Sequence, residues 1–166
     1  LLSRTPLTEV GRNIVGFTDE NSRVIAGTVD APGGPVRIVN GYFVNGQAPG
    51  TDKFEYKMSW LRGLRDWLRE ELAAHPRLVL LGDFNIAPED RDSYDPVGLA
   101  ESIHHTTEER DHFKALLGLG LHDAFRLFEQ PEKSYSWWDY RMLCYQKNRG
   151  LRLDHILVSA PLVPQV

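Results

Sequence analysis

The sequence predicts a layered α/β domain built on a mixed β-sheet. Two runs at residues 22–29 and 35–42 have the pattern of a strand pair joined by a turn. An amphipathic helix pattern follows over residues 53–74, and an aliphatic run then begins at Leu78. Because strands and helices are interspersed and two strands form a hairpin, a mixed sheet is favoured over a purely parallel one.

The first half of the chain supplies the hairpin and a long helix. The hairpin turn lies at Ala31-Pro32-Gly33-Gly34. The helix is expected over Lys53–Ala74 because its apolar residues recur at spacings of three and four, and Pro76 prevents it from continuing. We expect this apolar stripe to form core rather than a cofactor site. Its residues are Phe54, Met58, Leu61, Leu64, Leu68 and Leu72.

An aliphatic strand follows at Leu78-Val79-Leu80-Leu81 and is expected to be buried on both faces. It ends at Gly82, and Asp83 and Asn85 come directly after it. In open α/β sheets, ligands bind outside the carboxyl ends of the strands. Asp83 and Asn85 are therefore candidates for handling a phosphate, a metal ion or an attacking water.

The second half of the chain contains a shorter helix and two further strands. Residues 106–109 have the Thr-Thr-Glu-Glu pattern of a capping box, which predicts a helix to about Leu117, ended by Gly118. We expect strands over 134–138 and 151–159. No repeat and no clear linker interrupts the chain, so a single domain is expected over residues 1–166.

Composition limits the class of protein. The 166 residues are 42% apolar, which argues against disorder and is enough for a sizeable core. No apolar run approaches the roughly 20 residues needed to cross a bilayer, and no signal peptide is visible, so no membrane partner is expected. The lone Cys144 excludes an internal disulfide and fits a reducing compartment.

The net charge of −4 differs from the basic excess that is common in nucleic-acid-binding proteins. A local cationic face can nevertheless exist on an acidic protein. Lys147, Arg149 and Arg152 lie close together in the sequence, and either form such a face or are ordinary solvated charges. Their spacing alone leaves both interpretations open.

Three histidines, His104, His105 and His112, lie near Glu108 and raise the question of a zinc site. They do not provide a closed set of four ligands at finger-like spacing, and a helix would scatter these side chains. We therefore expect solvated or capping roles for them.

Four short motifs carry polar or aromatic residues at the ends of expected strands. They are Asn-Gly-Tyr-Phe at 40–43, Leu-Gly-Asp-Phe-Asn at 81–85, Ser-Trp-Trp-Asp-Tyr-Arg at 136–141 and Asn-Arg-Gly-Leu-Arg-Leu-Asp at 148–154. As a set, the chain resembles the exonuclease III family of DNA-repair nucleases, within the endonuclease/exonuclease/phosphatase superfamily. The resemblance implies a four-layer α/β sandwich of two mixed β-sheets with flanking helices, of which this chain is a partial copy.

The resemblance also implies an activity. It implies Mg²⁺-dependent hydrolysis of phosphodiester bonds in DNA, with Mn²⁺ as an alternative ion. The enzyme would be a 3′–5′ exonuclease and an abasic-site endonuclease in base-excision repair. Its partner would be double-stranded DNA with abasic sites or 3′ ends. A monomer in the bacterial cytoplasm, associated with the nucleoid, is implied.

Several residues of these motifs acquire catalytic roles from the resemblance. Asp83 would orient or deprotonate the attacking water, and Asn85 would contact the phosphate and help to stabilise its charge. The same two side chains would be metal ligands. Tyr42 would lie beside the scissile phosphate, and Asp154 would orient the family's catalytic histidine. We therefore expect these four side chains to converge on one crevice.

Three further residues are candidates for contacting the substrate. By the resemblance, Trp137 would line the pocket or wedge against the DNA near an extrahelical abasic sugar. Asn45 occupies a polar position that in the family can touch DNA. Arg149 is a candidate DNA contact, although Asn148-Arg149-Gly150 could also be only a turn.

Two parts of the family's site lie outside the chain. The resemblance places a metal-binding glutamate before Leu1 and the catalytic histidine after Val166, so we expect a piece of a longer protein that is poorly active alone. His155 is not expected to replace that histidine, because neighbours in a strand point to opposite faces. Two alternatives stay open: a phosphatase acting on inositol phosphates or phospholipid head groups, and a non-catalytic DNA-binding remnant.

Overall fold

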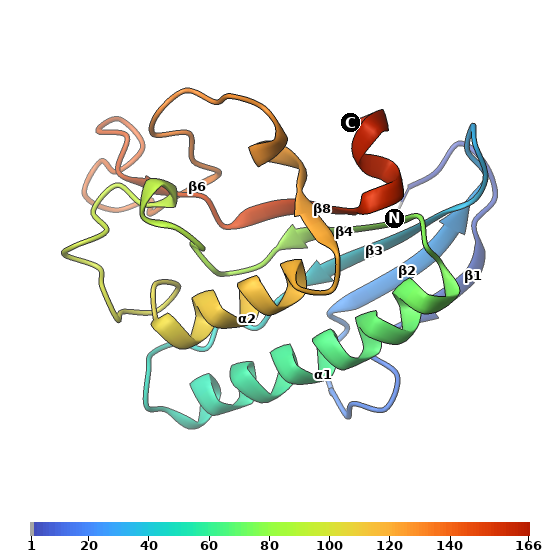
Figure 1. Ribbon diagram of the computed structural model, residues 1–166. Helices are drawn as coiled ribbons and strands as arrows, with labels where there is room; N and C mark the ends of the chain where they lie inside the picture. Colours follow the sequence, from blue (N-terminus) through green and yellow to red (C-terminus); the bar gives the residue numbers. More distant parts are fainter. Residues whose placement is uncertain (1) are drawn as a thin grey trace.

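The computed structural model describes residues 2–166 and contains a six-stranded mixed sheet with two helices on one side of it (Figure 1). The strand order is β1-β2-β3-β4-β8-β5, and β6 and β7 form a separate two-stranded sheet. The strands are β1 (Thr8–Arg12), β2 (Val24–Val29), β3 (Val36–Tyr42), β4 (Leu78–Asp83), β5 (Leu121–Asp123), β6 (Trp137–Trp138), β7 (Gly150–Leu151) and β8 (Asp154–Ser159). The helices are α1 (Asp52–Ala74) and α2 (Thr107–Leu117), with short 3-10 segments η1 (Asp90–Asp92), η2 (Ala124–Leu127) and η3 (Ala160–Gln165).

The sheet is mixed, as predicted. β2 and β3 form the expected antiparallel hairpin, while β3 and β4 are parallel and are connected through α1. β8 then pairs with β4 in the antiparallel sense. The mixed α/β fold class is confirmed. Within residues 2–166 it is represented by one helix layer on the six-stranded sheet, together with the small β6–β7 sheet.

Both helices lie close to their predicted bounds. Thr51 caps α1 by accepting a hydrogen bond from the third residue of the helix. α2 begins with the predicted capping box of Thr106 and Glu109 and ends directly before Gly118. No helix among residues 2–166 is long and apolar enough to span a bilayer.

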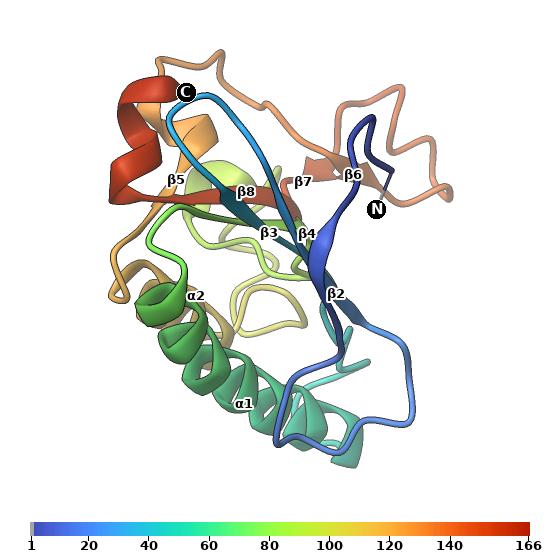
Figure 2. The ribbon, with the colours of Figure 1, turned by 90° about the vertical axis from the view of Figure 1, so that its right-hand side faces the viewer.

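Alternate residues of the strands point to two faces of the sheet, which differ in how they are covered. The helix face packs on α1 and α2 and includes Val39, Leu80 and Leu157, all fully buried. The second face is covered at one end by η2 and η3 (Figure 2). At the other end, where β3 and β4 finish, it is open, and Ile156 there is 49% exposed.

This difference corrects the expectation that the strand at 78–81 is buried on both faces. Leu78 and Leu80 are fully buried, but Val79 and Leu81 are only partly buried. The physical reason is that the described helices α1 and α2 cover one face only.

The last two predicted strands are shorter than expected. The strand at 134–138 is reduced to Trp137–Trp138, and the strand at 151–159 is broken into β7 and β8. The break occurs because the N–H groups of residues 152–154 bond elsewhere. Arg152 donates to the Asp92 carbonyl, and the next two residues donate to the hydroxyl of Ser136.

Candidate active site

Tyr42, Asp83 and Asp154 form a row across three neighbouring strands at the open end of the second face. Tyr42 ends β3 and is the register partner of Asp83, which ends β4; Asp83 is in turn the partner of Asp154, which begins β8. Since directly opposite residues share a face of a sheet, the three side chains project to the same side. Tyr42 and Asp154 are exposed and Asp83 is partly buried. We call these three residues the polar row.

One residue further along each strand, Phe43, Phe84 and His155 form an aromatic row on the helix face. The rings of Phe43 and Phe84 are stacked, with centroids 4.1 Å apart and planes 11° from parallel. The His155 ring lies 5.0 Å from Phe84. Trp60 of α1 and Phe113 of α2 contact the two ends of the row. The polar row therefore lies on the opposite face of the sheet from a packed layer of aromatic rings.

His155 belongs to this packed layer and points away from Asp154, as strand alternation predicts. It is buried, and its Nε2 donates to the carbonyl oxygen of Ile86 at 2.9 Å. Burial lowers the pKa of His155 to about 4, so the ring is neutral at neutral pH. The expectation that it does not act in the site agrees with this position.

Glycine is required at position 82, where β3 and β4 approach each other closely. Gly82 has a φ of +137°, and a Cβ at this position would lie 1.9 Å from the carbonyl oxygen of Gly41 on β3. Such an approach is possible only without a side chain. Gly82 thus allows Tyr42 and Asp83, the next residues on each strand, to lie side by side.

Asn85 lies in the loop after β4, buried behind the polar row. Its backbone N–H donates to Oδ1 of Asp83 at 2.9 Å. Its amide Nδ2 donates to the carbonyl of Phe43 at 3.1 Å, and its Oδ1 accepts from Nδ2 of Asn45 at 3.0 Å. Asn85 therefore joins the loop after β3 to the loop after β4.

The environment of Asp83 favours a basic carboxylate. Burial raises its pKa above the ordinary value, and the charge of Asp154 raises it further. The N–H of Asn85 and the ammonium of Lys57 act in the opposite direction, but the net shift is upward. A carboxylate with a raised pKa is better able to take a proton from water than a solvated one.

Two clefts border the polar row. Tyr42 and Asp83 line one of about 520 Å³, where the guanidinium of Arg23 lies 5.8 Å from the centre of the Tyr42 ring. Asp154 lines another cleft of about 410 Å³. Asn85 lines neither cleft. The structure thus brings three of the four predicted catalytic side chains into one row and places Asn85 behind them.

The donor chemistry of the polar row fits a divalent cation. Asp83 and Asp154 are carboxylates on adjacent strands, and the ion pairs among residues 2–166 involve neither of them. A hard cation prefers such oxygens and relieves their repulsion. Asn85, the other predicted ligand, has its oxygen directed to Asn45. The described residues contain no group of three or more His, Cys, Asp or Glu side chains placed to hold a metal ion.

Of the residues predicted to contact DNA, Trp137 lies on the short strand β6, and Arg149 and Asn45 lie on loops. Trp137 is exposed on β6, and the hydroxyl of Ser136 before it accepts a hydrogen bond from the N–H of Asp154 at 3.0 Å. This bond ties the small sheet to the polar row. Arg149 is exposed directly before β7, and Asn45 is exposed in the loop after β3.

The cationic face considered for Lys147, Arg149 and Arg152 does not form from all three residues, because Arg152 is buried. Its guanidinium donates to Asp92 at 2.7 Å and to Asp123 at 2.8 Å. Lys147 and Arg149 are exposed. Arg152 is therefore a structural ion-pair partner.

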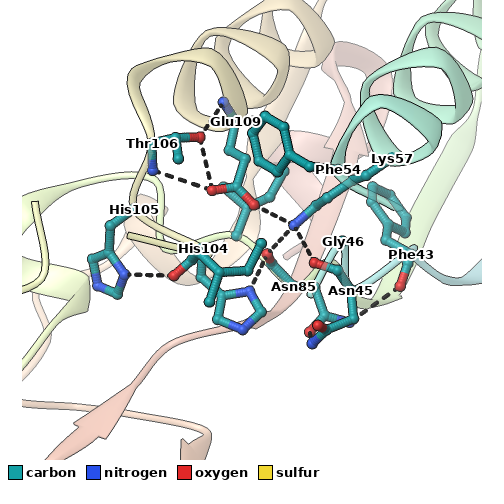
Figure 3. Close-up of polar contacts among 12 residues, drawn as sticks. Phe43, Asn45, Gly46, Phe54, Lys57, Asn85, His104, His105, Thr106 and Glu109 are labelled. Carbon is teal, nitrogen blue, oxygen red and sulfur yellow. Dashed lines mark hydrogen bonds and ion pairs between the residues drawn. The ribbon is translucent and has the colours of Figure 1, made fainter. Parts of the chain in front are cut away.

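Two buried charged residues behind the site were not predicted. Lys57 of α1 and Glu109 of α2 form an ion pair with no exposed side-chain surface (Figure 3). Lys57 interrupts the apolar stripe between Phe54 and Met58, and a lysine at such a position requires buried acceptors. That interruption is the pattern that could have revealed it. Glu109 is predicted only as a capping residue.

The expectation of solvated or capping roles is wrong for His104 and His105, because both side chains are buried. His104 Nδ1 lies 2.7 Å from the carbonyl oxygen of Asn85. Because a carbonyl oxygen only accepts, this nitrogen carries the hydrogen. Burial lowers the pKa of His104 to about 4, which keeps the ring neutral.

Comparison with known proteins identifies the relatives of this chain. Residues 1–166 match the endonuclease/exonuclease/phosphatase family. The sequence is 32% identical over 156 residues to exodeoxyribonuclease III from Haemophilus influenzae, covering 87% of this chain and 57% of that protein. A 3′ phosphatase from Neisseria bound to a product DNA hairpin is similar in structure, with a TM-score of 0.92 and 43% identity over 98% of this chain and 62% of the other.

An AP endonuclease from Archaeoglobus fulgidus has a TM-score of 0.87 and 26% identity over 96% of this chain and 61% of its own. The chain therefore spans less than two thirds of the length of each of these relatives. With a match along the whole sequence and a shared α/β fold, the chain belongs to the endonuclease/exonuclease/phosphatase family, and its relatives include nucleases of the exonuclease III type, as the four motifs predict.

Proposed function

We propose that the protein is a divalent-metal-dependent phosphodiesterase of the exonuclease III type that acts on double-stranded DNA. The polar row carries the proposal, because it presents a partly buried carboxylate, a second carboxylate and a phenol hydroxyl at one edge of the sheet. Hydrolysis of a phosphodiester needs a positioned water, a base and charge neutralisation. The similarity to exodeoxyribonuclease III and to an AP endonuclease supports DNA as the substrate.

In this proposal Asp83 takes the proton of the attacking water. Its Oδ1 is held by the N–H of Asn85, and Oδ2 has no hydrogen-bond partner within residues 2–166. The Tyr42 hydroxyl, at the rim of the cleft, donates to an oxygen of the phosphate. Asp154 orients a histidine of the full-length protein. Asp83 would hold a divalent cation such as Mg²⁺, with Asn85 as a further predicted ligand; such an ion supplies positive charge and favours ionisation of water.

The finer specificity is part of the same proposal. We expect removal of nucleotides from 3′ ends and cleavage at abasic sites, as steps of base-excision repair. Removal of a 3′ phosphate is a second candidate activity, favoured by the similarity to the Neisseria 3′ phosphatase. Trp137, Arg149 and Asn45 are the proposed DNA contacts. A monomeric state and a cytoplasmic, nucleoid-associated location stay predictions.

The test compares substrates with the protein in its natural full length. Duplexes carrying one abasic site, a 3′ hydroxyl end or a 3′ phosphate are incubated with Mg²⁺, with Mn²⁺ or with a chelator, beside an inositol phosphate. Metal-dependent nicking 5′ of the abasic site is expected, with loss of activity in the chelator. Dephosphorylation of the inositol phosphate with intact DNA would favour the phosphatase alternative. DNA binding without cleavage would favour a non-catalytic remnant. Residues 1–166 alone are expected to have little activity.

A further inference from the structure

Lys57 donates to acceptors in three different segments around the candidate site (Figure 3). Its Nζ lies 2.8 Å from the carbonyl oxygen of Asn85 and 3.1 Å from that of Asn45, and its third partner is the carboxylate of Glu109. An ammonium group has three N–H donors. All donors of Lys57 are therefore used inside the protein, and its side chain has no exposed surface.

Glu109, the acidic partner of the pair, is held in place at the start of α2. Its Oε2 accepts from the N–H of Thr106 at 3.1 Å and from the Thr106 hydroxyl at 2.8 Å. The other oxygen receives Lys57 from α1. The pair thus connects both helices to the loops that follow β3 and β4.

These two loops, and the segment that contacts them, contain backbone conformations that need support. Gln47, Asn85 and His104 have φ values of +61°, +52° and +72°, a region unfavourable for residues other than glycine. His104 donates to the same Asn85 carbonyl as Lys57. At Gly46 an added Cβ would lie 2.8 Å from Cδ of Lys57, so the first loop rests directly on the lysine side chain.

Asn85 connects Lys57 to Asp83 of the polar row through hydrogen bonds. While its carbonyl oxygen accepts from Lys57, its N–H donates to Asp83, and its side chain bonds Asn45. The carbonyl and the N–H of Asn85 flank the same Cα, so a shift of the Asn85 backbone would move the donor that holds the Asp83 carboxylate. Misplacement of a catalytic group by about 1 Å can lower a rate about a hundredfold.

A buried ion pair is not needed merely to join two helices, because apolar residues of similar size can do so at least as well. The Lys57 pair differs from a second pair, Arg37 and Glu71, in what else it touches. Arg37 and Glu71 join β3 to α1 with an N–O distance of 2.6 Å, near the start of β3, and neither bonds the site loops. This second pair is a matched control.

We infer that Lys57 is a positioning residue, which acts through the carbonyl oxygens of Asn45 and Asn85 to fix the N–H that holds Asp83. This inference rests on the proposed nuclease function. By this inference, Lys57 affects the position of the Asp83 carboxylate and not only the stability of the fold.

The test uses two double variants of the full-length protein, Lys57→Met/Glu109→Gln and Arg37→Met/Glu71→Gln. Each removes both charges of a pair, so neither leaves an unpaired buried charge. Four quantities are measured: the melting temperature, kcat and KM on an abasic duplex, and the hydrogen-exchange rate of the Asn85 backbone N–H. The last quantity reports the bond to Asp83 directly and needs no activity.

The Lys57 double variant is expected to lower kcat about tenfold to a hundredfold with KM changed less than about threefold. Its Asn85 amide should exchange at least about tenfold faster, because the loop loses its anchor. The Arg37 control should keep kcat and Asn85 exchange within about twofold, whatever its melting temperature. If the Lys57 double variant keeps both kcat and the Asn85 exchange rate within about twofold, as the control does, Lys57 has no positioning role.

If the wild-type protein does not cleave DNA but the Lys57 double variant still exchanges Asn85 faster, the nuclease proposal fails and the positioning of the loop stands.

Discussion

The polar row and the aromatic row are one residue apart on the same three strands, yet they meet opposite environments. Tyr42, Asp83 and Asp154 face an open part of the sheet, while the residues that follow them face two helices. On the helix side, Phe84 is fully buried between neighbouring rings. Strand alternation thus gives this chain a packed aromatic face and an open polar face at neighbouring positions of the same strands.

The two rows also differ in what a substitution should change. Side chains of the polar row contribute little packing, so their loss should affect chemistry more than folding. Side chains of the aromatic row contribute burial and contacts, so their loss should affect folding first. Variants placed one residue apart can therefore break or sharpen the comparison.

The largest effect is expected from Asp83→Asn in the full-length protein. Because the amide cannot accept a proton, kcat should fall about a thousandfold, while DNA binding is kept. The pKa of Asp83 is raised by burial, which means that folding disfavours its charged form at neutral pH. The variant should therefore melt at the same or a higher temperature.

Asp30→Asn is the control for this experiment, because Asp30 is exposed at the turn between β2 and β3. It should leave kcat and the melting temperature nearly unchanged. A near-normal kcat in Asp83→Asn would remove Asp83 from the proposed mechanism.

Phe84→Ala should have the opposite profile. Loss of a fully buried ring from the aromatic row is expected to cost about 3 to 5 kcal/mol of unfolding free energy. Urea denaturation measures this quantity, and Phe128→Ala, where the ring is 52% exposed, is the control. If Phe84→Ala unfolds at the same urea concentration as the control, the aromatic row is not the support of the polar row.

Gly82→Ala tests the close approach of the two strands that present Tyr42 and Asp83. A Cβ at position 82 would lie 1.9 Å from a backbone oxygen, so the strands must separate. We expect a loss of about 2 to 4 kcal/mol, combining the strained φ with overpacking. Gly120→Ala is the matched control, because Gly120 has a φ of +92° with nothing within 4 Å of its Cβ position.

The control should lose about 1 to 2 kcal/mol from the backbone strain alone. Chemical denaturation of both variants gives the difference, which measures the contact between β3 and β4. Equal losses in the two variants would show that the strand contact is not tight in solution.

Local patterns predict the strand that ends at Asp83, whereas the expectation that Tyr42 and Asp154 lie beside it came from the family resemblance. The hairpin, the apolar stripe of α1 and the capping box of α2 all depend on residues within one or two turns of each other. The aliphatic run before Gly82 predicts a strand end, and alternation places His155 opposite Asp154. These features follow from periodicity and turn chemistry, which are encoded locally.

Features that depend on partners far along the chain could not be predicted in this way. Lys57 and Glu109 are 52 residues apart, and Arg152 finds Asp92 60 residues earlier. The burial of His104 also depends on contact with the loop after β4. Such pairs are specified by tertiary packing, so a charged residue inside an apolar stripe signals that a partner exists without identifying it.

The smallest effect is expected from His155→Phe, and it concerns pH. Burial lowers the pKa of His155 from 6.5 to about 4, so the unfolded chain binds a proton that the folded chain does not. Stability contributed by the neutral ring is complete above pH 6.5 and is lost as the pH falls towards 4.

The phenylalanine ring of the variant keeps the stacking but loses the hydrogen bond to Ile86, which costs about 1 kcal/mol of unfolding free energy at pH 7.5. Unfolding midpoints at pH 7.5 and pH 5 should therefore differ less in the variant than in the wild type, with His104 supplying the remaining slope. If the unfolding midpoints of the variant and the wild type change equally between pH 7.5 and pH 5, His155 is accessible to protons in the folded protein. The aromatic row would then not be tightly packed around this ring.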